Sequence, residues 1–122
     1  MIDWVEFNNQ NQYYGKELLC EIIDLFEFGE SGKNDSYEAR LKMLDEAIRQ
    51  KDFKKINTTS HGLKSISGNF FDPVFTGLAK KLMVMGDEEI EDGLSENFEQ
   101  LKIAAANLLV ELREYRKTLS GN

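Results

Sequence analysis

The chain has 122 residues, of which 41% are hydrophobic, and it carries a net charge of −7 at pH 7. This length suffices for one globular domain with a buried core and without a disulfide or a structural metal. The acidic balance argues against nucleic acid or an anionic membrane as the main partner, because both are bound through positive surfaces. The single cysteine, Cys20, cannot form an intramolecular disulfide, and with the single histidine, His61, it cannot build an ordinary zinc site.

The chain contains no apolar run that approaches the length of a membrane span. Its acidic first residues do not match a signal peptide, which needs a basic region followed by an apolar one. We therefore expect a cytoplasmic protein with no membrane partner.

The first elements expected are a short N-terminal segment and one helix. Residues 1–14 form a cap segment, with a helical piece around 2–7 in which Trp4 covers one end of a core. Residues 15–28 carry apolar side chains at helical spacing opposite charged ones, and they predict a helix. The glycine-containing stretch 29–34 then breaks it.

The next two helices should form a hairpin. Asp35 and Glu38 are a capping pair for a helix that runs to about Gln50. Asp52 is the expected N-cap of the following helix, which extends to Phe71. Because the connection between these two helices is short, they should pack antiparallel.

The second half of the chain predicts two more helices. Asp72 followed by Pro73, the only proline, is a strong helix start, and this helix should end at Gly86. The acidic stretch 87–92 favours a last helix that begins near it, because carboxylates stabilise the positive end of the helix dipole. Gly93 either bends this last helix or delays its start.

The last helix should run to residue 118, with a frayed tail over 119–122. The helices share apolar positions three and four residues apart, and no strand or internal repeat is predicted between them. We therefore expect an all-α fold. Residues 15–118 should form an up-and-down antiparallel four-helix bundle, with the N-terminal helical piece as a short addition.

The helix expected at 52–71 carries the only histidine on its polar face. Ile56, Leu63 and Phe70 mark the apolar direction, which lies far around the helix from His61. The polar or small residues within about 60° of His61 are Asn57, Lys64, Ser65 and Gly68. The imidazole should therefore point outward, where it is either a nucleophile or base near pH 7 or a surface histidine without a role.

Two glycines lie inside this same helix, where each costs up to about 1 kcal/mol relative to alanine. Gly68 and the small Ser65 leave a shallow surface beside His61, as a docking partner or a phosphoryl group would require. Gly62, about 100° around the helix from His61, is the better candidate for close helix packing. Lys64 is either a solvated lysine or a cation that neutralises a phosphoryl oxygen.

Basic charge is concentrated around the histidine. The segment 49–81 contains seven basic and two acidic residues, a net charge of +5, whereas the rest of the chain carries −12. A basic patch on an acidic protein favours docking to an acidic surface of a partner.

Residues 61–70, HGLKSISGNF, closely resemble the signature of the histidine-containing phosphotransfer (HPt) domain family. That signature is a histidine, any residue, leucine, lysine and glycine, followed by small residues. The resemblance covers residues 15–115. Other positions that match the family pattern are Phe26, Leu44, Ala47, Asp52, Leu78, Ala79 and Leu82.

The resemblance implies a role in phosphorelay signal transduction. His61 would accept a phosphoryl group from an aspartate of a response-regulator receiver domain, including that of a hybrid histidine kinase, and pass it to another receiver. Lys64 would stabilise the phosphoryl charge. The docking surface would consist of Lys54, Asn57, Ser65, Gly68 and Lys80. The chain would be a monomeric phosphoryl carrier without a cofactor and not an enzyme, because the receiver supplies the Mg²⁺ and most catalytic groups.

Three positions depart from the family pattern. Ser65 stands where members usually have glycine, but it is small and its hydroxyl is a hydrogen-bond donor for phosphate. Phe71 also replaces a usual glycine and should change how the helix ends and packs. Met83 stands where the facing helix often supplies a Gln or Glu that steadies the imidazole, which a thioether cannot do.

Two other functions are consistent with parts of the sequence. A non-catalytic helical adaptor that binds a receiver or a histidine kinase without phosphotransfer would explain the basic hairpin and Met83 equally well. A metal-binding bundle is disfavoured, because the helices lack paired Glu and Glu-x-x-His ligands.

Overall fold

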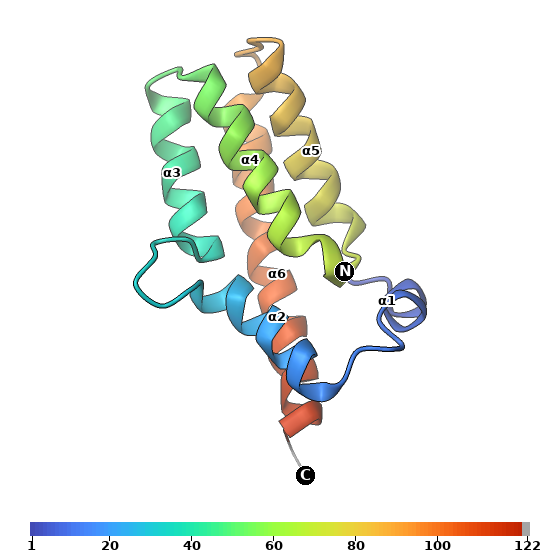
Figure 1. Cartoon of the computed structure of the whole chain (residues 1–122). Helices are drawn as coiled ribbons and strands as arrows, with labels where there is room; N and C mark the ends of the chain where they lie inside the picture. Colours follow the sequence, from blue (N-terminus) through green and yellow to red (C-terminus); the bar gives the residue numbers. More distant parts are fainter. Residues whose placement is uncertain (121–122) are drawn as a thin grey trace.

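The computed structural model describes residues 1–120, and over this range the chain is all-helical (Figure 1). The helices are α1 Trp4–Gln10, α2 Lys16–Phe28, α3 Tyr37–Arg49, α4 Phe53–Ser67, α5 Pro73–Asp87 and α6 Leu94–Ser120, with a 3₁₀ turn, η1, at Gly68–Phe70. The all-α class predicted from the sequence is confirmed. Within residues 1–120, no helix combines the length and the apolar character that crossing a membrane requires.

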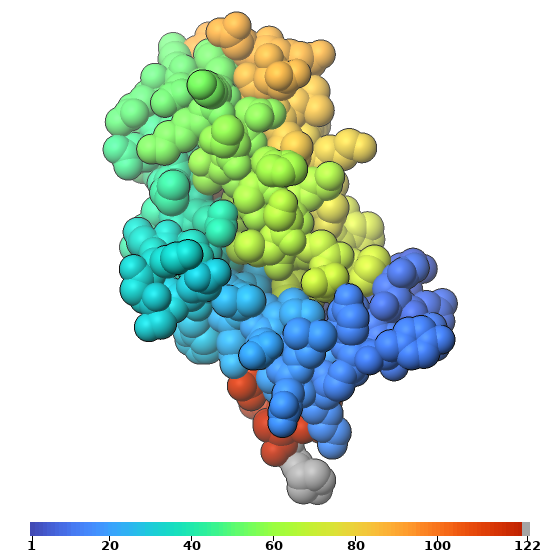
Figure 2. Space-filling model, viewed as in Figure 1, coloured from blue at the N-terminus to red at the C-terminus, as the bar shows by residue number. Residues whose placement is uncertain are grey.

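Helices α3, α4, α5 and the first half of α6 stand side by side, and consecutive helices of this group run in opposite directions (Figure 1). Helix α4 contacts both α3 and α5, and α5 also contacts α6. Helix α2 packs against α6, and α1 lies beside η1 near the lower end of α4 (Figure 1). One face of α4 is left open to solvent (Figure 2).

The apolar stripe of α4 forms the centre of the core. Ile56, Leu63 and Phe70 are fully buried, as the helical spacing predicts. The Phe26 ring of α2 packs edge-on against the rings of Phe70 and Phe75, with centroids 5.5 and 6.0 Å away. Because this stripe faces inward, the opposite side of α4 points away from the core, and its residues Lys54, His61 and Ser65 are exposed.

The N-cap residues of α4 and α5 are the aspartates that the sequence predicts. The Asp52 carboxylate accepts a hydrogen bond of 3.1 Å from the Lys55 backbone N–H. The Asp72 carboxylate accepts two, of 3.0 and 3.1 Å, from backbone N–H groups in the first turn of α5. Pro73 is the first residue of α5, where its missing N–H costs nothing.

The start of α3 differs from the prediction. Ser36, and not Asp35, is the N-cap, and its hydroxyl accepts a 3.1 Å hydrogen bond from the Ala39 N–H. The Asp35 carboxylate instead accepts a 2.8 Å hydrogen bond from the Glu30 N–H and lies against Gly29. The Asp35 side chain, which the sequence pattern assigned to the N-cap of α3, therefore closes the loop before that helix instead.

Helix α4 ends earlier than the predicted Phe71. Its α-helical bonding stops at Ser67, whose hydroxyl donates to the backbone carbonyl of Leu63 at 2.9 Å and so competes with the regular helical pattern. After η1, Phe71 adopts φ 55° and ψ 47°, a left-handed conformation that glycine adopts most easily. A glycine at this position would adopt this conformation without the steric cost that the Phe71 side chain adds.

Helix α5 extends to Asp87, one residue beyond its predicted end. Glu89, at φ 55°, then turns the chain, and the Ile90 N–H donates to the Met85 carbonyl at 2.9 Å. This is the hydrogen bonding of a Schellman C-cap. The acidic stretch 87–92 therefore forms the C-terminal turn of α5. The last helix begins near this stretch, as predicted, but after it and not within it.

Helix α6 begins at Leu94, directly after Gly93, whose φ of 87° suits glycine. Of the two outcomes expected for this glycine, the structure shows the delayed start. Helix α6 continues through Ser120, past the predicted end at residue 118. The first two residues of the expected tail are thus helical, and residues 121–122 lie outside the described range.

Candidate functional site

His61 lies on the open face of α4. Its side chain is exposed, whereas its neighbours Ser60 and Leu63 are fully buried. The outward direction predicted from the helical spacing is confirmed. The imidazole is therefore reachable from solvent, while the backbone that carries it is fixed in the core.

The other residues of the expected site form a strip along the same face. On α4, Lys54 and Ser65 are exposed and Asn57 and Lys64 are half-buried, and Gly68 is exposed in η1. Lys80 is exposed on the neighbouring helix α5. A Cβ added at Gly68 would meet no atom within 4 Å, so the surface at that point is open.

Asn57 has a structural contact that the sequence did not reveal. Its side-chain Nδ2 donates a 2.8 Å hydrogen bond to the backbone carbonyl of Met83 and joins α4 to α5. Met83 therefore contacts the site residue Asn57 through its backbone carbonyl, and its thioether side chain is half-buried. The imidazole gains no polar side chain from this position of α5.

Ser65 also has a partner within its own helix. Its hydroxyl donates a 3.0 Å hydrogen bond to the backbone carbonyl of His61, one turn earlier. A rotation of the hydroxyl would break this weak internal bond and turn the donor toward an anion on the open face. The side chain adds little bulk beside the imidazole.

Lys64 lies at the edge of a pocket of about 460 Å³, which the ends of α4 and η1 form with α1 and the start of α5. Asp3, the N-cap of α1, and Glu6 within α1 line the same pocket. Within residues 1–120, Lys64 forms no ion pair with a carboxylate. Its ammonium group is therefore available to neutralise an anion next to His61.

The structure places a second cation near His61, which was not predicted from the sequence. Arg40 of α3 lies against Gly62, and a Cβ built on that glycine would be 2.5 Å from the guanidinium Nη1. The close contact expected at Gly62 is thus with a charged side chain and not with an apolar helix face. The only sequence signal was a glycine inside a helix, which does not identify its partner.

The basic segment 49–81 divides into paired and unpaired cations. Arg49 pairs with Asp45 at 3.0 Å, and Lys51 pairs with Glu91 at 2.9 Å. Four exposed lysines of this segment have no ion-pair partner in the described range: Lys54, Lys55, Lys80 and Lys81. The unpaired positive charge thus lies on α4 and α5, the two helices that carry the strip.

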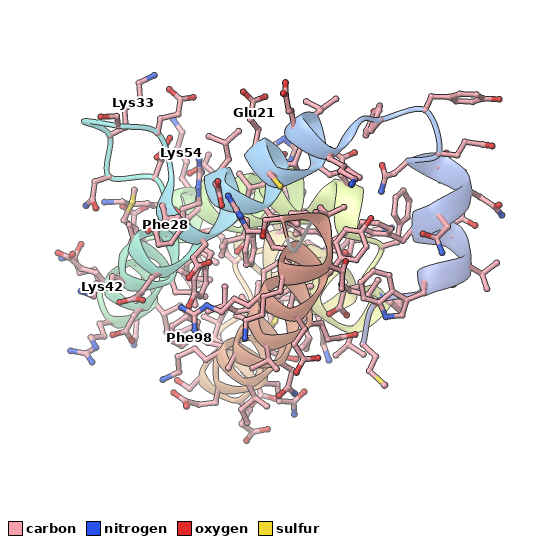
Figure 3. The ribbon with its side chains drawn as sticks, turned by 90° about the horizontal axis from the view of Figure 1, so that it is seen from below. Glu21, Phe28, Lys33, Lys42, Lys54 and Phe98 are labelled. Atoms are coloured by element: carbon pink, nitrogen blue, oxygen red, sulfur yellow. The ribbon has the colours of Figure 1, made fainter. Side chains whose placement is uncertain are left out.

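Helix α2 adds exposed apolar side chains on the same side of the molecule. Leu18 and Leu25 are more than one third exposed, and Phe28 is 68% exposed. Figure 2 shows α2 and the open face of α4 on one surface, and in Figure 3 Glu21 of α2 and Lys54 lie on the side opposite Phe98 of α6. This patch was not predicted from the sequence. The apolar side chains of α2 cover a wider arc of the helix than the part that is buried against α6, so some of them remain exposed.

No group of three or more His, Cys, Asp or Glu side chains within residues 1–120 is placed to hold a metal ion. Comparisons with models of protein families, with curated proteins and with solved structures found no match to this chain.

Proposed function

We propose that this protein is an HPt-type phosphorelay carrier, which accepts a phosphoryl group on His61 from a receiver-domain aspartate and passes it to a second receiver. We further propose that residues 15–118 form the up-and-down antiparallel four-helix bundle of that family, with α3 to α6 as its four antiparallel helices and α2 packed against α6. We also propose that the protein acts as a cytoplasmic monomer. The observation that carries the proposal is an exposed imidazole beside an open glycine and a lysine that has no ion-pair partner within residues 1–120, on a helix whose other face is buried.

The chemistry requires only a nucleophile from this chain. A ring nitrogen of neutral His61 attacks the phosphorus of the aspartyl phosphate. The P–O bond to the aspartate breaks, and its electron pair returns to the receiver carboxylate. In the second transfer the acceptor carboxylate attacks phosphorus, the P–N bond breaks, and its electron pair returns to the imidazole. Lys64 offsets the charge of the phosphoryl oxygens during both steps.

The remaining catalytic groups and the Mg²⁺ come from the receiver in this proposal. The strip of Lys54, Asn57, Ser65 and Gly68 supplies a shallow surface for docking, and the unpaired lysines of α4 and α5 attract an acidic pocket. The exposed apolar side chains of α2 extend this surface and are a suitable contact for apolar side chains of the receiver.

The test is incubation of the purified protein with phosphorylated receiver domains, in parallel with the His61→Gln variant. The wild type should acquire a phosphoryl group that is labile in acid and stable in base, because it is held by a P–N bond. His61→Gln should acquire none, although its circular dichroism and thermal unfolding remain those of the wild type, since the side chain is exposed. Equal labelling of both proteins would disprove the proposal.

A second candidate is a helical adaptor that binds a receiver or a histidine kinase without phosphotransfer. It is favoured by Met83, whose side chain offers the imidazole no hydrogen bond. In that case a receiver would bind the wild type and His61→Ala with similar affinity, and no receiver would label the wild type. Binding measured beside the labelling assay separates the two functions.

A further inference from the structure

Arg40 of α3 contacts α4 at Gly62. Glycine inside a helix lowers its stability, and such a position needs a reason in the packing. At Gly62 an added Cβ would be 2.5 Å from Arg40 Nη1 and 3.6 Å from its Cζ. The missing side chain therefore makes room for a guanidinium group directly beside the residue that follows His61.

The Arg40 side chain is held in place without being neutralised. Its Nε–H donates a 2.9 Å hydrogen bond to the Asp35 backbone carbonyl, and the residue is half-buried. Among residues 1–120 it forms no ion pair. The terminal N–H groups of the guanidinium, which suit phosphate geometry, bind no carboxylate of that range.

Two cations thus flank the imidazole from opposite directions. Gly62, on which Arg40 lies, is about 100° around α4 from His61, and Lys64 is about 60° around it in the opposite sense. Arg40 comes from α3, whereas Lys64 lines a pocket with residues of α1 and α5. A phosphoryl group on His61 would be held between a planar guanidinium and an ammonium group.

We propose that Arg40 binds the phosphoryl group carried by His61, and that residue 62 is glycine so that the guanidinium can reach it. This inference rests on the proposed function of His61. A guanidinium donates two hydrogen bonds to phosphoryl oxygens and keeps its charge at any physiological pH. Arg40 then stabilises the negative charge of the phosphoryl group on His61. The sequence pattern had assigned this role to Lys64 alone.

The experiment compares phosphorylation of His61 in the wild type, Arg40→Gln and Arg40→Lys. Each protein is treated with phosphoramidate, a small donor that needs no receiver, and separately with phosphorylated receivers. Loss of a charged hydrogen bond should slow the loading of Arg40→Gln by roughly 10- to 100-fold with either donor, and Arg40→Lys should retain an intermediate rate. Arg49→Gln is the matched control, because Arg49 lies on the same helix and pairs with Asp45.

A second pair of variants tests the glycine. Gly62→Ala meets only the movable end of Arg40, so the protein should keep its helicity and thermal stability but load at a rate close to that of Arg40→Gln. Adding Gly62→Ala to Arg40→Gln should cause little further loss, because both act through one contact. Gly77→Ala is the control, since a Cβ there meets nothing within 4 Å.

Nuclear magnetic resonance provides a readout that a merely structural role would not change. The Arg40 side-chain N–H signals should shift when His61 is phosphorylated, and those of Arg49 should not. Equal loading rates of wild type and Arg40→Gln, with unshifted signals, would overturn the role of Arg40 and leave that of His61 intact. No label on the wild type from either donor would overturn both.

Discussion

A histidine that carries a phosphoryl group must be reachable by a large partner while its backbone stays in place. In this chain the two requirements are met by adjacent residues, because His61 is exposed and Ser60 before it is fully buried. The Ser60 hydroxyl has no hydrogen-bond partner within residues 1–120, whereas that of Ser67, on the same buried side of α4, bonds to the Leu63 carbonyl at 2.9 Å. An unsatisfied buried hydroxyl lowers stability.

Ser60→Ala should therefore raise the free energy of unfolding by about 1 kcal/mol, because it removes a buried unpaired donor and introduces a better helix former. The measurement is urea denaturation followed by circular dichroism. Ser67→Ala is the control and should leave stability unchanged or lower it, since its hydroxyl is bonded. A loss of stability in Ser60→Ala as large as in Ser67→Ala would show that the Ser60 hydroxyl does have a partner.

Among the residues of the site, the sequence predicted the direction of His61 and the exposed strip on α4, because both follow from the helical period. It did not predict the bond between Asn57 and the Met83 carbonyl, nor the position of Arg40 over Gly62. These contacts join residues of different helices. Their partners are set by how the helices cross, which local spacing does not contain.

At the scale of the elements, the contact of α4 with α5 determines how the open face is presented. Gly86 of α5 approaches the start of α4 so closely that an added Cβ would be 2.6 Å from the Asn57 backbone N and 2.8 Å from the Phe53 carbonyl oxygen. Backbone atoms cannot move aside as the end of a flexible side chain can. This glycine therefore fixes the spacing of the two helices.

Gly86→Ala should lower the free energy of unfolding by about 2 kcal/mol, because the methyl group forces the two backbones apart. Gly77→Ala on the same helix lies in open space and should raise it by up to about 1 kcal/mol through helix propensity. Denaturation of both variants is the check. Equal effects of the two substitutions would mean that α4 and α5 are not in close contact at Gly86.

Helix α2 is attached to α6 by charged pairs as well as by its apolar side. The Arg116 Nε donates a 2.8 Å hydrogen bond to Asp24 Oδ1. This hydrogen bond holds the pKa of the Asp24 carboxyl below its ordinary value of 3.8, although partial burial opposes the shift. The pKa of Asp24 is thus lower in the folded protein than in the unfolded chain. The stability that the Asp24–Arg116 pair contributes is therefore complete at pH values above the unfolded-state pKa, and it is lost as the pH falls through the folded-state pKa.

Arg116→Gln should therefore return the pKa of Asp24 toward 3.8, as measured by a nuclear magnetic resonance titration of its carboxyl carbon. The variant should lose no more than about 1 kcal/mol at neutral pH, because the pair is partly exposed, and this difference should vanish in strong acid. An unchanged Asp24 titration midpoint would show that the pair does not form in solution.

At the scale of the whole molecule, the N-terminal segment joins η1 to the C-terminal half of α6 at one end of the fold. The Asp3 N–H donates a 2.8 Å hydrogen bond to the Phe71 carbonyl, just after η1. The Trp4 and Phe7 rings pack on Tyr115 of α6, with centroids 5.2 and 5.0 Å away. The expectation that Trp4 covers one end of the core agrees with this packing, which also positions α1 beside the pocket that Lys64 lines.

The fold was predictable from the sequence where a local signal acts alone. Asp52 and Asp72 cap their helices, and the 3.3 Å hydrogen bond that the Met1 ammonium group donates to Asp72 Oδ1 leaves the second cap in place. Asp35 failed as a cap because loop closure uses its carboxylate. The acidic stretch 87–92 forms the C-terminal turn of α5, and the last helix begins near it, as predicted, but only after Gly93. The outward apolar side chains of α2 went unnoticed, because only the packed structure shows which side of a wide apolar arc is covered.

The most direct test of the central claim follows a phosphoryl group from one receiver, through this protein, to a second. Two receiver domains that do not exchange phosphoryl groups with each other are mixed with catalytic amounts of the wild type or of His61→Gln, and the second receiver's aspartyl phosphate is measured over time. We predict that the wild type labels the second receiver and that His61→Gln does not. Transfer at the same rate with His61→Gln would contradict the account.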